Sequence, residues 1–167
     1  MIATRRGRRA ANMAGVVIVV ALMSYALYEQ HVVGLEVCPL CVMQRAAMIA
    51  LGFVFLAAAL HSARGGIARV YSVLGVLVAL TGAGISGWHV RLQHLPADQV
   101  PSCGPGFDYI IDAFPLRDAL KMIFTGSGEC AKINWTFLGF SMPSWVLLWF
   151  VALGALIAVA NWRQLTR

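Results

Sequence analysis

The chain has 167 residues, of which 60% are hydrophobic and only 12% are charged, and its formal net charge is +6. Soluble domains carry about a quarter charged residues, so this composition excludes an ordinary soluble domain. The positive charge gives no reason to expect nucleic-acid binding, because the arginines follow the membrane topology derived below.

Four apolar runs account for the composition. They cover about residues 10–28, 40–60, 67–88 and 143–160, and each has roughly the 17–25 residues that a helix needs to cross a bilayer. Helices satisfy their own backbone hydrogen bonds, as lipid requires. The sequence therefore predicts an all-α membrane protein, a four-transmembrane-helix bundle that forms a single domain over residues 1–167.

The first run has an alternative interpretation as a cleaved signal peptide. Ser24, Tyr25 and Ala26 loosely resemble a small-residue cleavage site. The run is longer than the core of a typical signal peptide, so we expect it to be retained as a helix. Cleavage would leave the orientation of the other three helices unchanged.

The arginines orient the bundle. If four helices alternate, the arginines of the N-terminus, of the 2–3 connection and of the C-terminus share one side of the membrane, namely Arg5, Arg6, Arg8, Arg9, Arg64, Arg69, Arg163 and Arg167. The positive-inside rule makes that side cytoplasmic. We therefore expect cytoplasmic termini and periplasmic loops over about residues 29–39 and 89–142.

The second periplasmic loop is long and rich in glycine and proline, as functional loops often are. Within it, Pro115–Phe124 places apolar residues on one helical face and begins with a proline suited to a first turn. This pattern predicts a short interfacial helix on the bilayer surface. Packing against the ends of the bundle is the alternative.

All four cysteines fall on the predicted outer side, where disulfides persist if the compartment is the periplasm. Cys38 and Cys41 form a C-P-L-C motif at a helix start, on one face of the first turn. A helix N-terminus favours a thiolate, and Arg45 lies one turn deeper on the same face, where its charge favours a Cys41 thiolate. A charged residue in a span is a functional candidate; the alternative is an arginine that snorkels to the headgroups.

The other two cysteines, Cys103 and Cys130, have 26 residues between them and lie among glycines and prolines. A purely structural disulfide is one interpretation, since closing such a loop stabilises a fold by about 3 kcal/mol in the entropy model. A zinc site of four cysteines, with His89 or His94 as substitutes, is another. Zinc sites normally combine two close pairs, so we expect no metal. Four cysteines allow three pairings, and their spacing selects none.

Two thiol pairs that face an oxidising compartment suit an electron relay by thiol–disulfide exchange. A pair at the membrane edge needs an electron acceptor, and a lipid-soluble quinone can reach that depth. Arg45 could donate a hydrogen bond to a quinone carbonyl and stabilise charge on the reduced ring. The sequence therefore predicts a quinone as cofactor without selecting ubiquinone or menaquinone.

Several motifs, in this order, are similar to the DsbB family, the membrane enzymes that reoxidise the periplasmic oxidant DsbA with quinone. The resemblance covers most of the chain, with a less similar loop around Cys103. The motifs are Q-H-V at Gln30–Val32, C-P-L-C-V-M-Q-R at Cys38–Arg45, H-V-R-L-Q at His89–Gln93, G-E-C-A at Gly128–Ala131, W-T-F-L-G at Trp135–Gly139 and M-P-S-W at Met142–Trp145.

The resemblance implies a protein-dithiol:quinone oxidoreductase of the bacterial inner membrane. A reduced DsbA-like protein with a thioredoxin fold would attack a Cys103–Cys130 disulfide at Cys103. Cys130 would pass the electrons to Cys38 and Cys41, through a transient Cys38–Cys130 bridge. The Cys41 thiolate would contact the quinone from the membrane pool.

Two further residues acquire roles from the resemblance, which implies that Arg45 binds the quinone and that His89 lies near it. The alternative for His89 is a polar residue at the membrane interface. Gln44 is acidic in some members of the family, and we assign it no role in proton transfer.

Three functions compete with this interpretation, and the order of the cysteines argues against the first of them. A vitamin K epoxide reductase-like enzyme carries its loop cysteines before the C-x-x-C motif, whereas here Cys38 and Cys41 come first. A DsbB paralogue could serve one dedicated partner. A redox-inert membrane scaffold would hold two structural disulfides that exchange no electrons.

Overall fold

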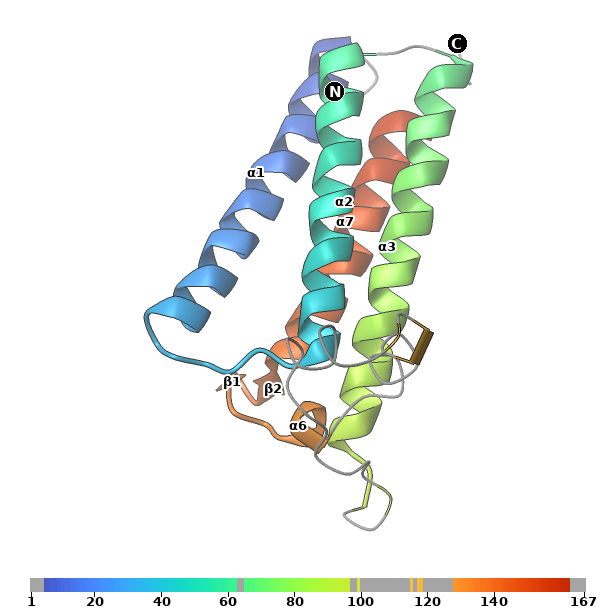
Figure 1. Ribbon diagram of the computed structural model, residues 1–167. Helices are drawn as coiled ribbons and strands as arrows, with labels where there is room; N and C mark the ends of the chain where they lie inside the picture. The colour runs from blue at the N-terminus through green and yellow to red at the C-terminus, as the bar shows by residue number, and fades with distance from the viewer. Residues whose placement is uncertain are drawn as a thin grey trace.

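The computed structural model describes residues 5–62, 65–96, 99, 115, 117–118 and 128–162. Four long helices form the bundle shown in Figure 1: α1 (Arg5–His31), α2 (Pro39–His61), α3 (Gly66–Gln93) and α7 (Met142–Trp162). All four are long and apolar enough to cross a membrane. The predicted four-helix membrane protein is therefore confirmed.

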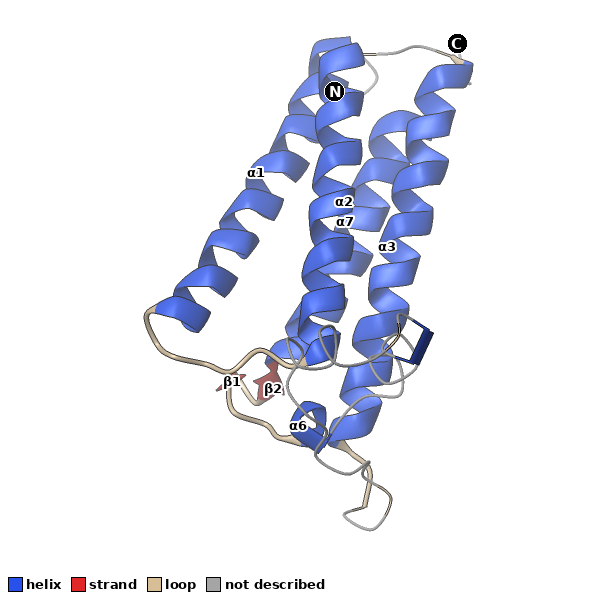
Figure 2. Cartoon of the chain, in the orientation of Figure 1, coloured by secondary structure: helices blue, strands red, loops and turns tan. Residues whose placement is uncertain are grey.

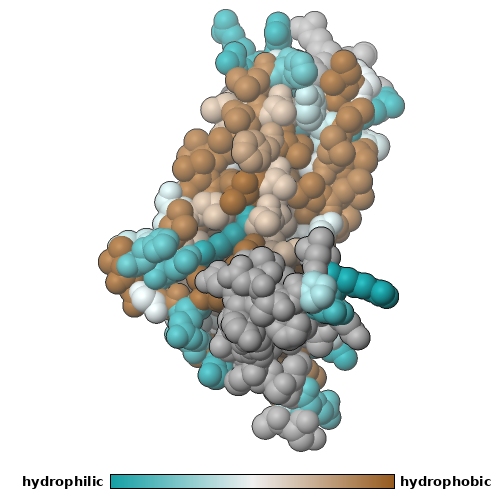
Figure 3. All heavy atoms as spheres, in the orientation of Figure 1, coloured by the Kyte–Doolittle hydropathy of each residue, from teal (hydrophilic) through white to brown (hydrophobic). Residues whose placement is uncertain are grey.

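The helices extend beyond the predicted apolar runs. α1 begins at Arg5 and α3 continues to Gln93, because a helix keeps its backbone hydrogen bonds after the chain leaves the hydrocarbon layer. On the face drawn in Figure 3, hydrophobic side chains cover the middle of the bundle and hydrophilic ones gather toward its two ends. Many large apolar side chains among the described residues are exposed, as expected for contact with lipid.

The start of α2 is defined by the cysteine motif itself. Cys38 is the N-cap, with extended backbone, and its sulfur accepts a hydrogen bond from the Cys41 backbone N–H. Pro39 occupies the first helical position, where its missing N–H costs nothing. The motif therefore fixes both cysteines at the helix N-terminus.

The most extensive helix–helix contact is between α3 and α7. Gly75 and Gly82 on α3 face Ile157 and Phe150 of α7, and an added Cβ at either glycine would overlap the facing side chain. Phe150 is completely buried in the main hydrophobic core. Small residues let the backbones approach closely, which is how helices associate in membranes.

A short cap covers one end of the bundle, opposite to the end where α1 begins and α7 finishes (Figure 1). It contains α6 (Gly128–Ala131) and a hairpin of β1 (Thr136–Phe137) and β2 (Phe140–Ser141), which pair antiparallel. The hairpin turns through Leu138 and Gly139, both with positive φ, the geometry of a tight two-residue turn.

The sequence did not predict this hairpin, which Figure 2 shows between α6 and α7. Two strands of two residues each are too short to give a periodic signal. The predicted interfacial helix at Pro115–Phe124 lies largely outside the described residues, as does Cys103.

Candidate functional site

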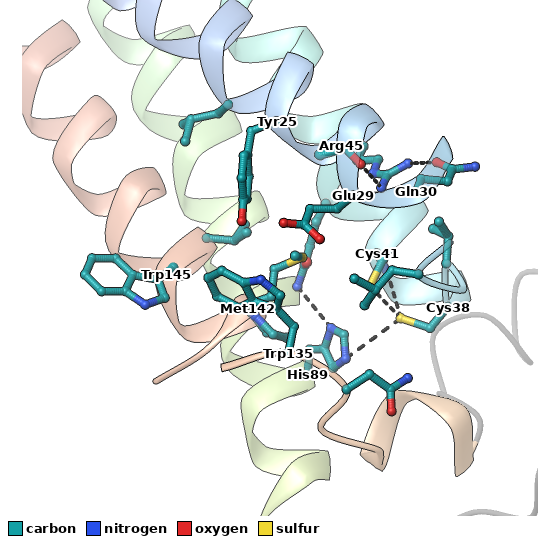
Figure 4. A pocket seen from close by; sticks show the side chains of 18 of the residues that line it. Tyr25, Glu29, Gln30, Cys38, Cys41, Arg45, His89, Trp135, Met142 and Trp145 are labelled. Atoms are coloured by element: carbon teal, nitrogen blue, oxygen red, sulfur yellow. Dashed lines mark hydrogen bonds between the residues drawn. The ribbon is translucent and has the colours of Figure 1, made fainter. Parts of the chain in front are cut away.

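A cavity of about 550 Å³ opens at the capped end of the bundle. Its walls come from α1, the start of α2, the outer end of α3, the segment around β1 and the start of α7 (Figure 4). Most of the lining is apolar, with Trp135, Trp145 and Trp149 among its aromatic residues. Cys38 and Cys41 also line it. The cavity thus brings an apolar space next to the cysteine pair.

Three of the four predicted cysteines meet beside this cavity. The Cys38 and Cys41 sulfurs are 2.7 Å apart, with the Cys38 thiol as donor. Cys130, carried by α6, is completely buried, and its sulfur lies within 4.8 Å of that of Cys38. Cys38 is therefore within reach of both other sulfurs, although 92 positions separate it from Cys130 in the chain.

Cys38 is held as a thiol. Hydrogen bonding to Cys130 and to Cys41, followed by burial, raises the pKa of Cys38 above its ordinary value. Each cause favours the neutral form. The Cys38 thiol donates a hydrogen bond and the Cys41 sulfur accepts it. The two cysteines of the motif therefore have different hydrogen-bonding roles.

His89 connects α3 to both cysteine segments. Its Nε2 lies 3.1 Å from the Cys130 carbonyl oxygen and 3.8 Å from the Cys38 sulfur. Its Nδ1 lies 3.3 Å from the side-chain nitrogen of Gln44. Since an amide NH₂ donates, Nδ1 accepts and Nε2–H donates to the carbonyl. This buried histidine therefore fixes the position of the Cys130 segment next to the start of α2.

Arg45 lines the same cavity, but its hydrogen bonds lead to α1. One guanidinium nitrogen donates to the Gln30 side-chain oxygen, and the other donates to the Ala26 carbonyl at 3.0 Å. Sequence periodicity placed Arg45 one turn below Cys41 and left its partners undetermined. Gln30 belongs to the Q-H-V motif, so a signal for this partner was present in the sequence.

Cys38, His89 and Cys130 also have the proximity that a metal site needs, because their ligand atoms lie within 4.8 Å of one another. In the tautomer described above, however, Nε2 of His89 is a donor and offers no lone pair to a metal. His94, the other histidine considered for zinc, is exposed and bonds to the Val90 carbonyl. The absence of a bound metal remains a prediction.

Sequence reasoning missed two polar residues of the site. Gln44 is buried and orients His89, although it was assigned no role. Glu29 is also buried and lines the cavity, whereas none of the sequence motifs described above includes it. The available signal was a carboxylate at the end of an apolar run, because Asp and Glu side chains are almost never buried unless they are paired.

The sequence profile of the family described as Disulfide bond formation protein DsbB matches residues 8–160. This chain belongs to the DsbB family. A protein named Disulfide bond formation protein B from Methylococcus capsulatus is 50% identical over 155 residues, which cover 93% of this chain and 94% of the relative. One of the same name from Acinetobacter baumannii is 51% identical, covering 84% and 81%.

Membership in the DsbB family confirms the resemblance found in the sequence motifs. Another relative of the same name, from an Azoarcus species, is 44% identical over 162 residues and covers 97% of this chain. The matches therefore include the four helices and the cap. Together with the four apolar helices, they indicate that this chain is a multi-pass membrane protein that takes part in disulfide bond formation. Its activity is that of an oxidoreductase that generates disulfides.

Proposed function

We propose that this DsbB-family protein is a protein-dithiol:quinone oxidoreductase, which reoxidises a DsbA-like thioredoxin-fold protein and passes the electrons to a quinone. The observation that carries the proposal is the position of the Cys38–Cys41 pair, between the buried Cys130 on one side and the apolar cavity on the other. A thiol pair in that position can receive electrons from one side and release them on the other.

The relay begins at the loop cysteines. The reduced partner attacks a Cys103–Cys130 disulfide at Cys103, and a second partner thiol resolves the mixed disulfide, so the partner is oxidised and Cys103 and Cys130 become thiols. The Cys130 thiolate then attacks a Cys38–Cys41 disulfide at Cys38. A transient Cys38–Cys130 bond forms, and Cys41 leaves as a thiolate. The proximity of the Cys38 and Cys130 sulfurs supports this step.

The cycle closes when Cys103 attacks Cys130, which restores the loop disulfide and releases Cys38 as a thiol. Oxidation of the Cys38 thiol and the Cys41 thiolate to a disulfide then delivers two electrons and one proton, the other proton of the partner dithiol having been released when Cys130 ionised. His89 supports the exchange because it holds the Cys130 carbonyl, and with it the attacking residue, near the start of α2.

The residues around the cavity fit a quinone. Ligand sites are typically apolar spaces with a few convergent polar groups, and this cavity combines three tryptophans with Arg45 and His89. A bound quinone would supply the two-electron acceptor. Arg45 would hydrogen-bond a ring oxygen and stabilise its developing charge, while the tryptophans would hold the ring and exclude water. Both ubiquinone and menaquinone are candidates.

The proposed location is the bacterial inner membrane, with cytoplasmic termini and a periplasmic active site. Arg5, Arg6, Arg9 and Arg69 lie at one end of the helices, and the positive-inside rule makes that end cytoplasmic. Cys38, Cys41 and Cys130 lie at the opposite end, which would then face the periplasm. The chain would act as one domain over residues 1–167, in contact with membrane lipid and its quinone pool.

The decisive experiment is quinone reduction by the purified protein, followed optically, with a reduced DsbA-like protein as donor. Ubiquinone and menaquinone analogues are tested separately. Dithiol-dependent reduction that disappears in Cys41→Ser would support the relay and its terminal thiol. Failure with both quinone types by a folded protein would favour a dedicated-partner paralogue or a redox-inert scaffold.

A further inference from the structure

Glu29 places a carboxylate inside the cavity. It lies at the outer end of α1, two residues before the helix ends at His31, and is only 7% exposed. Figure 4 shows its side chain projecting from α1 into the space between Tyr25 and the cysteine pair. Of the two acids among the described lining residues, Glu36 is exposed and Glu29 is buried.

The immediate surroundings of Glu29 are polar and aromatic. Its carboxylate interacts with the phenol of Tyr25, and the Tyr25 ring packs edge-on against Trp135 with the ring centroids 6.3 Å apart. A buried carboxylate is costly unless it is paired or serves a function. Arg45, a cation that lines the same cavity, donates to Gln30 and to the Ala26 carbonyl.

Two polar residues of the site, Gln44 and His89, are poorly suited to carrying protons. Gln44 is an amide and does not titrate, and both nitrogens of His89 are engaged by Gln44 and by the Cys130 carbonyl. Glu29 adjoins the exposed segment that follows α1, in which Val32 and Val33 are accessible to solvent. The carboxylate therefore lies near the outer end of α1 while its side chain faces the cavity.

We propose that Glu29 is a catalytic proton carrier for the quinone, an inference that rests on the proposed function. Oxidation of the Cys38 thiol and the Cys41 thiolate to one disulfide releases two electrons, and the Cys38 proton passes to water; reduction of a quinone to a hydroquinone takes up two electrons and two protons. Glu29 gives one proton to a ring oxygen and regains it from the outer surface. The second proton reaches the other oxygen from water.

The test uses the full-length protein, reduced in advance and mixed anaerobically with a ubiquinone analogue, so that no protein partner is needed. Glu29→Gln keeps the size of the side chain and removes the proton. General acid–base catalysis typically contributes roughly 10²–10⁴-fold, so we expect a loss of at least about 10²-fold in the single-turnover rate. Glu29→Asp should retain more activity than Glu29→Gln. Asp118→Asn, at an exposed acid outside the cavity, is the matched control and should keep the wild-type rate.

A second readout is independent of turnover. Redox-difference infrared spectra of the quinone-loaded protein should contain a carboxylic-acid C=O band that shifts in D₂O, persists in Asp118→Asn and disappears in Glu29→Gln. The pH dependence of the rate is compared between wild type and Glu29→Gln, because other titratable or charged groups also face the cavity: Tyr25 on α1, Glu36 after it, Cys41 and Arg45 on α2, His89 on α3 and Lys132 before β1.

A slower Glu29→Gln variant that has lost the infrared band would support the proton-carrier role. An unchanged rate, or a slow variant that keeps the band, would overturn it. Wild-type protein that reduces no quinone would instead contradict the proposed function, so the two failures are distinguishable.

Discussion

The Nε2 of His89 lies 3.1 Å from the backbone carbonyl oxygen of Cys130. This bond joins a transmembrane helix to a four-residue helix in the cap, and it places Cys130 near Cys38. Because Gln44 donates to the other ring nitrogen, the imidazole of His89 connects α3 to both α2 and α6.

Replacement of His89 by alanine should slow electron transfer between the two cysteine pairs. Loss of a buried hydrogen bond that leaves partners unsatisfied costs about 1–3 kcal/mol, and Cys130 would lose its fixed position. The rate of appearance of the Cys38–Cys130 bond, trapped by acid quenching and measured by mass spectrometry, should fall about tenfold or more. His94→Ala, at an exposed histidine whose side chain bonds to the Val90 carbonyl, should leave the rate unchanged.

The Cys41→Ser variant should lose quinone reduction while Cys103 still traps a DsbA-like partner. Serine cannot serve as the terminal thiolate, and Cys38 remains within reach of Cys130. The measurement combines the optical quinone assay with non-reducing electrophoresis of the partner adduct. Full turnover by this variant would contradict the proposed order of electron transfer.

Replacement of Arg45 by alanine should weaken the use of quinone more than it affects folding. Arg45→Ala removes the donor proposed for a ring oxygen, so the quinone concentration at half-maximal rate should rise by about tenfold, equivalent to roughly 1.4 kcal/mol. Arg91→Ala is the control, because Arg91 is exposed and lies over the Trp88 ring, 5.4 Å from its centroid. An unchanged quinone dependence in Arg45→Ala would argue against the binding role.

Cys38 should resist alkylation at alkaline pH more strongly than Cys41. The pKa of Cys38 is raised by its hydrogen bonds to Cys130 and Cys41, so the folded protein keeps this proton at a pH where an unfolded thiol ionises. The stability that protonated Cys38 contributes is therefore complete below the ordinary thiol pKa and declines at more alkaline pH. Mass spectrometry after brief iodoacetamide treatment of the reduced protein would measure both modifications; faster labelling of Cys38 would contradict this prediction.

The α3–α7 contact provides a prediction about stability alone. Gly82→Ala should destabilise the protein by about 1–3 kcal/mol, because the new methyl group would overlap the buried Phe150 ring. Gly84→Ala on the same helix has open space around its Cβ position and should be neutral or stabilising. Thermal unfolding in detergent, followed by circular dichroism, gives the unfolding midpoints of the two variants. Equal midpoints would contradict the prediction, because they would show that α3 and α7 can move apart without loss of stability.

The four spans were predictable because lipid imposes a strong and local constraint. A run such as 143–160 must be apolar and helical wherever it crosses a bilayer, and α7 covers it as expected. Cys38 and Pro39 likewise carried a local signal for a helix start. The β1–β2 hairpin carried none, since its two-residue strands depend on the cap around them.

The sequence by itself determined the membrane class, the order of the cysteines and the family. Only the tertiary structure decided that Cys38 lies within reach of Cys130, that Arg45 bonds to α1, and that Glu29 enters the cavity. The physical reason is that hydrophobicity and helix capping act between residues close in the chain. The contacts of the site join residues on different helices, and these contacts depend on how the helices pack.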